Sequence, residues 1–85
     1  MAEDWHCVHF VRMRAKDEPG VLSSILAPFA ASGGNILTIN QGIPVNGCAA
    51  VTVGAETSGL QTSMEELLER VRELEGVLRC EIMAG

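Results

Sequence analysis

Apolar residues follow two helical and four strand-like patterns along the chain. Between residues 20 and 32 they recur every three or four positions, which predicts an amphipathic helix. Residues 63–76 repeat that spacing and predict a second helix. Alternation of apolar and polar residues predicts strands at 5–15, 36–40, 48–53 and 77–83.

Special backbone chemistry separates these segments. Pro19 fixes its own φ and pushes Glu18 to extended geometry, so the first helix cannot begin before Gly20. Gly33 or Gly34 can take the left-handed conformation that ends a helix.

The remaining joints also carry sequence signals. Asn46-Gly47 is the strongest short hairpin signal and joins the second and third strands. Gly76 is expected to close the second helix. Two capping boxes compete for its start: Ser63 with Glu66, and Thr62 with Glu65.

Alternation also predicts which side chains face the helices. In the first strand we place the odd-numbered set inward and Arg12 and Arg14 on the open face. The inward set is His9, Val11, Met13 and Ala15. The set expected inward in the fourth strand is Leu78, Cys80 and Ile82.

The order β-α-β-β-α-β predicts an α+β, ferredoxin-like sandwich. Right-handed crossovers put both helices on one face of a four-stranded antiparallel sheet. Eighty-five residues make one small domain, 1–85, with a core spanning about 6–83. This plan hosts many unrelated activities, so it does not give a function.

Composition narrows the classes of protein. No apolar segment approaches the roughly 20 residues that span a bilayer, and the acidic start lacks signal-peptide features, so we expect a cytoplasmic protein without membrane contact. A net charge of −5 argues against nucleic acid as a partner. RNA binding would need aromatic side chains on the sheet, and Phe10 is the only strand aromatic between about residues 8 and 83.

The cysteines and histidines form no recognisable site. Cys7, Cys48 and Cys80 are odd in number and lack a CxxC pair, so we expect reduced, buried or half-buried thiols and no disulfide framework, metal site or copper-chaperone activity. His6 and His9 point to opposite faces of a strand.

No catalytic residue can be named. Neither a Ser/His/Asp nor a Cys/His set can be assembled. Glu65, Glu66 and Glu69 are better explained as charges on a helix surface than as a carboxylate pair. We therefore expect neither catalysis nor a cofactor.

The residues from 17 to 41 resemble the ACT domain, a small regulatory module attached to many enzymes of amino-acid metabolism. The likeness rests on Asp17-x-Pro-Gly-Val-Leu22 and on Gly34-Asn-Ile36. The run Asn35-Ile-Leu-Thr-Ile-Asn-Gln41 is similar to the PheB-type group of ACT proteins. Members of that group carry additional sequence before the module, so the chain is either free-standing or a domain of a longer protein.

The resemblance implies a small amino-acid effector bound where two modules pair side by side, as a homodimer or higher oligomer. It implies a site at the turn after the first strand, completed from the neighbouring subunit. The positions that match are Asp17, Glu18, Pro19, Gly20, Val21, Leu22, Asn35 and Ile36.

The side-chain and backbone chemistry of these positions allows either a ligand contact or a purely structural role. Unpaired amides at the helix start suit a carboxylate, and Asp17 can accept from an ammonium group. Asp17 could instead form an Asx-turn or cap the helix, while Gly20 and Asn35 could serve only their turns. Some ligand-binding ACT modules present a histidine where this chain has Ala15.

The sequence thus predicts a non-catalytic regulatory module. The alternative is a ligand-free dimerisation module of a larger ACT-containing protein.

Overall fold

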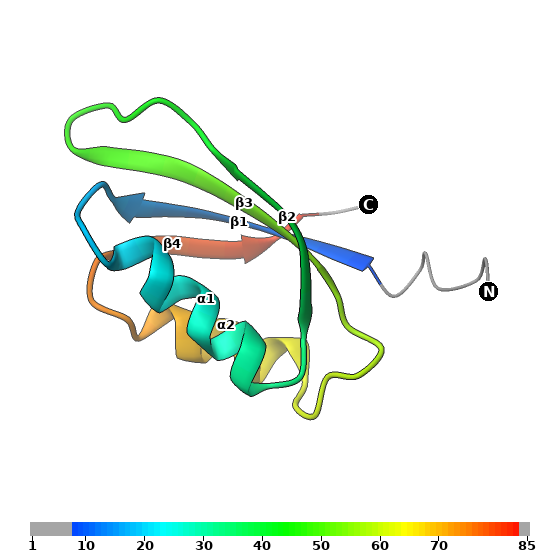
Figure 1. Cartoon of the computed structure of the whole chain (residues 1–85). Coiled ribbons are helices and arrows are strands. Elements are labelled where there is room, and N and C mark those ends of the chain that lie inside the picture. Colours follow the sequence, from blue (N-terminus) through cyan, green and yellow to red (C-terminus); the bar gives the residue numbers. More distant parts are fainter. Residues whose placement is uncertain (1–7, 84–85) are drawn as a thin grey trace.

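The structure is a computed structural model of the chain, and it describes residues 8–83. The predicted start of the first strand at Trp5 lies outside these residues, as do His6 and Cys7. Figure 1 shows a sheet with both helices against one of its faces. The element order is β1 (Val8–Lys16), α1 (Val21–Ala31), β2 (Asn35–Gln41), β3 (Cys48–Glu56), α2 (Met64–Arg72) and β4 (Val77–Ile82).

The sheet is antiparallel and has the strand order β2-β3-β1-β4. β1 and β3 are its central strands, so β2 and β4 form its two edges. This topology, with two helices on one face, confirms the predicted ferredoxin-like fold.

The register of the two central strands determines what each face of the sheet carries. β1 and β3 pair without interruption from Val8 opposite Glu56 to Lys16 opposite Cys48. Odd-numbered residues of β1 lie under the helices, whereas Arg12 and Arg14 are exposed on the open face. The predicted orientation of β1 is confirmed.

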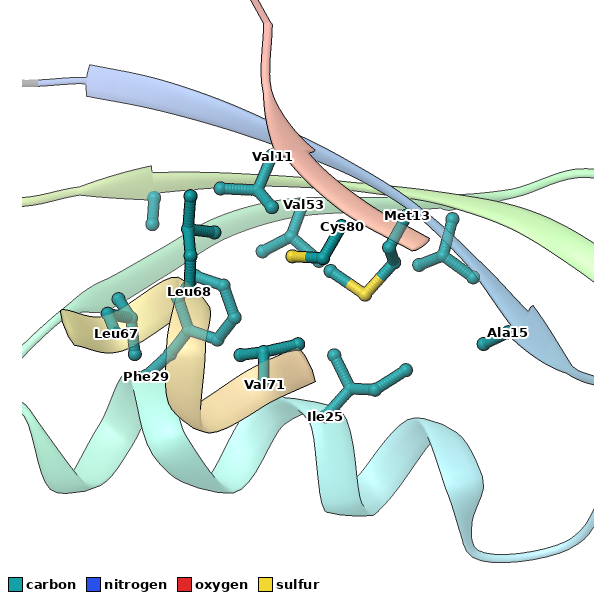
Figure 2. Close-up of a cluster of buried hydrophobic side chains, with 12 residues drawn as sticks. Val11, Met13, Ala15, Ile25, Phe29, Val53, Leu67, Leu68, Val71 and Cys80 are labelled. Carbon is teal, nitrogen blue, oxygen red and sulfur yellow. The ribbon is translucent and has the colours of Figure 1, made fainter. Parts of the chain in front are cut away.

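The hydrophobic core fills the space between the sheet and the helices (Figure 2). β1 and β3 supply one side of the core, and the apolar faces of α1 and α2 supply the other. Burial of these side chains is the main stabilising contribution that a domain this small can make. Its largest fully buried apolar side chains are Phe29, Met13, Ile25, Leu67, Val11, Val53 and Val71.

The local signals at the hairpin and at α2 are confirmed. Asn46 and Gly47 both have positive φ, 54° and 79°, as a tight type I′ hairpin requires. At α2, the Ser63 side chain accepts from the Glu66 amide at 3.1 Å, and the Glu66 side chain accepts from the Ser63 amide. The competing capping box is therefore not the one formed.

Two predictions about the last third of the chain are wrong. α2 ends at Arg72, with Glu73 as its C-cap, so it stops short of Gly76. Leu78 is 54% exposed and does not face the core, whereas Cys80 is buried and Ile82, opposite the buried Val11, lies on the inner face as predicted but is 41% exposed at the sheet edge. The pairing of β1 with β4 shifts between Arg14 and Ala15, which breaks the alternation at Leu78, and an edge strand has neighbours on one side only.

α1 is followed by Gly33 and Gly34, whose amides donate hydrogen bonds back to the last turn of the helix. The Gly34 amide donates to the Phe29 carbonyl at 2.8 Å, and the Gly33 amide donates to the Ala30 carbonyl at 3.2 Å. This is a Schellman ending, and Gly33 occupies its left-handed position with φ of 88°. A Cβ at Gly33 would lie 2.5 Å from the carbonyl oxygen of Gly59. The close approach ties the end of α1 to the loop before α2.

We expect Gly33→Ala to lower the free energy of unfolding by about 2–4 kcal/mol, because it adds left-handed strain and a backbone clash. Gly47→Ala is the matched control, since Gly47 also has positive φ but has no atom within 4 Å of the added Cβ. The control should lose only about 1–2 kcal/mol. Urea unfolding of both variants measures the difference, and equal losses would show that the contact with Gly59 contributes nothing.

The cysteines described by the structure match the expectation of free thiols. Cys48 is half-buried and Cys80 is buried. Burial raises the pKa of the Cys80 thiol; the nearby Arg72 lowers it and Glu81 raises it further. Arg72 also donates to the Cys80 carbonyl through Nε at 3.1 Å and Nη2 at 2.9 Å, which joins α2 to β4.

The pKa of Cys80 is raised in the folded state, so at alkaline pH the thiol loses its proton more easily in the unfolded chain than in the folded one. Rising pH therefore favours the unfolded chain. The contribution to stability is complete below the unfolded thiol pKa of about 8.5 and is lost as pH rises through the folded value. The free energy of unfolding should therefore fall more steeply above about pH 8.5 in the wild type than in Cys80→Ala. Parallel curves from urea unfolding would contradict this.

Candidate ligand-binding site

A cleft of about 420 Å³ opens where β1 ends and α1 begins. The β1–α1 turn forms one wall, the first turns of α1 form another, and β2 and β3 complete it. Its lining residues are Ala15, Lys16, Asp17, Glu18, Pro19, Gly20, Val21, Leu22, Ser23, Ile25, Gln41, Ala49 and Val51.

Two backbone hydrogen bonds fix the turn beside the cleft. The Lys16 amide donates to the Gly76 carbonyl at 2.8 Å, and the Asp17 amide donates to the Gly47 carbonyl at 2.8 Å. The first bond attaches the turn to the segment before β4, and the second attaches it to the β2–β3 hairpin. The turn is thus held from both sides by parts of the chain distant in sequence.

The start of α1 presents unpaired amides to the cleft. Gly20 is the N-cap, with φ of 86°, and no side chain caps the helix. The Val21 amide donates to the Glu18 carbonyl at 3.2 Å. The next two amides, of Leu22 and Ser23, have no acceptor within residues 8–83. Such amides, at the positive end of a helix dipole, favour an anion.

Asp17 is free of the structural roles that compete with ligand binding. Because Gly20 is the N-cap, the alternative in which Asp17 caps the helix is wrong. An Asx-turn would require the amide of Pro19, which has no N–H. The Asp17 carboxylate instead accepts from Gln41 Nε2 over 3.5 Å, a long bond between two exposed side chains. The carboxylate therefore stays accessible at the rim of the cleft.

Small apolar side chains form the floor. Ala15, Ala49 and Val51 are 2%, 2% and 3% exposed, and Ile25 is fully buried. Ala15 has no polar group, so the cleft is apolar there. The site combines an apolar floor, helix amides and one carboxylate.

The structure divides the eight predicted site residues into two groups. Residues 17–22 all line the cleft. Asn35 and Ile36 begin β2 at the far end of α1, and eleven helical residues separate the two ends by about 16 Å (Figure 1). One copy of the chain does not bring the two groups together.

Sequence analysis missed the contribution of Gln41 and the β3 floor. Gln41 pairs with Val51 and Ile39 pairs with Val53, so both lie on the face that carries the core residues of β3. The spacing of Ile39 and Gln41 in an alternating strand was the available signal. Ala49 and Val51 lie on the inner face of β3, and their nearness to the turn depends on the pairing of β1 with β3.

Two other kinds of site find no support in the described part of the chain. Within residues 8–83, no group of three or more His, Cys, Asp or Glu side chains could hold a metal ion. None of the helices described there is long and apolar enough to cross a membrane.

Comparison with known proteins identifies the family. The family described as ACT domain matches residues 9–76. A UPF0735 ACT domain-containing protein from Acetivibrio thermocellus is 46% identical over 69 residues, which is 81% of this chain and 47% of that protein. The chain spans about half the length of the curated relatives it matches, at 47% and 45%.

Solved structures share the fold at low sequence identity. The ACT domain from GTP pyrophosphokinase of Chlorobium tepidum has a TM-score of 0.69 at 18% identity, over 89% of this chain and 96% of that one. The regulatory subunit of aspartate kinase from Thermus thermophilus has a TM-score of 0.60 at 16% identity, over 88% and 54%. The resemblance to the ACT domain is therefore confirmed. The relatives are described as UPF0735 ACT domain-containing proteins. The comparisons therefore support the ACT domain but not the narrower PheB-type group.

Proposed function

The chain belongs to the ACT domain family, and we propose that it is a non-catalytic regulatory module that binds a small amino acid at a homodimer interface. The observation that carries the proposal is the cleft at the start of α1, where unpaired helix amides, an accessible carboxylate and an apolar floor meet. These are the three chemical groups that a free amino acid requires of its site.

The ligand carboxylate would bind the amides of Leu22 and Ser23. They are unpaired within the described residues, and the helix dipole favours negative charge there. The absence of a side chain at Gly20 supports this placement, because a ligand can approach the backbone closely. Asp17 would accept from the α-ammonium group, and the ligand side chain would lie on Ala15 and Val51.

Dimerisation through β2 would bring the two groups of predicted residues together. β2 is an edge strand with unpaired backbone groups, and Leu37 and Ile39 are 49% and 42% exposed on it. β2 runs from Asn35 to Gln41 and is centred on Thr38. If two β2 strands pair antiparallel about that residue, Asn35 lies opposite Gln41 of the partner subunit. Gln41 lines the cleft, so Asn35 of the partner subunit would lie at the rim of each cleft.

Regulation would follow from the ligand's contacts with both subunits. A ligand that touches residues 17–23 of one copy and Asn35 of the other binds the paired state more tightly than the separate subunits. Its differential affinity shifts the population toward that state. A domain linked to this module in a longer protein would sense the shift.

A ligand-free dimerisation module is the second candidate. Two observations favour it: Ala15 makes the floor apolar where a polar ligand contact could have been, and the chain spans only about half of its curated relatives. In that case β2 pairing would serve assembly alone.

We expect one or two of the twenty amino acids to raise Tm in a thermal-shift screen. A ligand at 100 times its Kd adds about 2.7 kcal/mol of stability, a shift of about 10 °C or more for a domain of this size. Asn35→Ala should remove the shift, because the partner's contact is lost.

Asn40→Ala is the matched control for this screen. Asn40 lies on the same strand, but in a β2 pairing centred on Thr38 it lies opposite Ile36 of the partner subunit and away from the cleft. Its shift should equal that of the wild type. A panel with no response from a folded dimer would contradict amino-acid binding and leave the dimerisation module.

The assembly itself can be tested at the two sheet edges. Ile39→Lys places a charge on the β2 edge and should reduce the mass measured by analytical ultracentrifugation to that of a monomer. Leu78→Lys places the same charge on the β4 edge, where the side chain is 54% exposed, and should leave the dimer intact. Circular dichroism checks that both variants fold. A dimer that survives Ile39→Lys would contradict pairing through β2.

A further inference from the structure

Three arginines gather on the open face of the sheet, away from the cleft. Arg12 and Arg14 come from β1 and Arg79 from β4, which is the neighbouring strand. A hollow of about 290 Å³ lies among them. Its lining residues are Arg12, Met13, Arg14, Ala50, Arg79 and Glu81.

The strand register places two of these positive charges against each other. Arg14 lies directly opposite Arg79, and like charges at such positions destabilise a sheet. Glu81, the single acidic residue of the hollow, lies opposite Arg12 and not opposite Arg14. Within the described residues, no hydrogen bond or ion pair engages the guanidinium groups of Arg14 and Arg79. Both keep their donors available.

The concavity has a structural origin. Ala50 lies opposite Arg14 on the other side of β1, and its short side chain leaves space that a longer one would fill. Guanidinium groups around such a space can bind carboxylate or phosphate oxygens through paired hydrogen bonds.

The charge of this hollow contrasts with that of the whole chain. The chain carries 6 basic and 11 acidic residues, with a net charge of −5. Half of the basic residues line this one hollow, together with one acid. The local charge is therefore positive on a protein whose net charge is negative.

We propose that the open face holds a second binding site, for a small ligand with two or more oxyanion groups, phosphate or carboxylate. The hollow is near the lower end of the range for ligand pockets, about 300 Å³, which fits a compact polyanion. A long nucleic acid is disfavoured because the chain is acidic and Phe10 is the one exposed aromatic side chain among residues 8–83. The site is independent of the cleft and of β2 pairing.

The test uses inorganic pyrophosphate as the phosphate probe and citrate as the carboxylate probe. Each is titrated into the full chain at neutral pH and constant ionic strength, with Tm and calorimetric Kd as the measurements. Binding of either probe supports the site, and the comparison between the two assigns the oxyanion class. Arg14→Gln and Arg79→Gln should each raise Kd about tenfold or more, since each removes charge-assisted hydrogen bonds.

A second measurement separates binding from a structural role. Without ligand, Arg79→Gln should raise Tm by a few degrees, because the opposition to Arg14 is relieved. If a substitution raises Tm without ligand and also abolishes binding of the probe, the replaced residue contributes to binding and not to folding stability. Arg70→Gln is the matched control: Arg70 lies on α2, and its Nη1 is 3.4 Å from Ser32 Oγ, so the probe response should be unchanged.

Three outcomes would overturn the proposal. One is the absence of any response to both probes in the folded wild type. Another is an equal response in the wild type and in all three arginine variants, which would indicate general screening of charge. The third is a change in oligomer mass in Arg79→Gln without a probe response in the wild type, which would assign the face to protein docking.

Discussion

The pairing of β1 with β3 is the constraint on which the rest of the structure depends. Nine residues of each strand pair in one continuous register, at the centre of the sheet. A shift of one residue would exchange the two faces, sending Val11 and Met13 to solvent and Arg12 and Arg14 into the core. The same register positions Ala15 beside Ala49 and Arg14 beside Ala50. The floor of the cleft and the hollow of the open face thus lie on opposite faces of the sheet, and the pairing of β1 with β3 positions both.

The candidate cleft lies where several elements end together. The turn after β1 is bound to the Gly76 segment and to the Gly47 hairpin, so its shape does not depend on its own sequence alone. Gly20 starts α1 with positive φ, and without a side-chain cap the first amides stay available. A Ser, Thr, Asn or Asp side-chain cap would have stabilised the helix over Gly20 by only a few tenths of a kcal/mol. α2, by contrast, begins with a complete capping box, in which the Ser63 side chain occupies the Glu66 amide.

The two layers of the molecule differ in charge, and this separates their roles. The outer face of α2 and the segment after it carry Glu65, Glu66, Glu69, Glu73 and Glu75. The open face of the sheet carries the arginines of β1 and β4. Neither side takes part in the β2 edge, so side-by-side pairing would leave both exposed.

The sequence by itself determined the elements, their order and the joints between them, because those signals are local. Gly33, Asn46-Gly47 and the Ser63–Glu66 capping box act through bonds to residues a few positions away. The turn before the first helix was also predicted from local signals, and the resemblance to the ACT domain identified residues 17–22 as a candidate site. Tertiary structure decided what depends on a partner strand: the irregular pairing that exposes Leu78, the place of Gln41 at the cleft and the opposition of Arg14 and Arg79. Alternation within one strand cannot report these features, because each is set by the register with a strand distant in sequence.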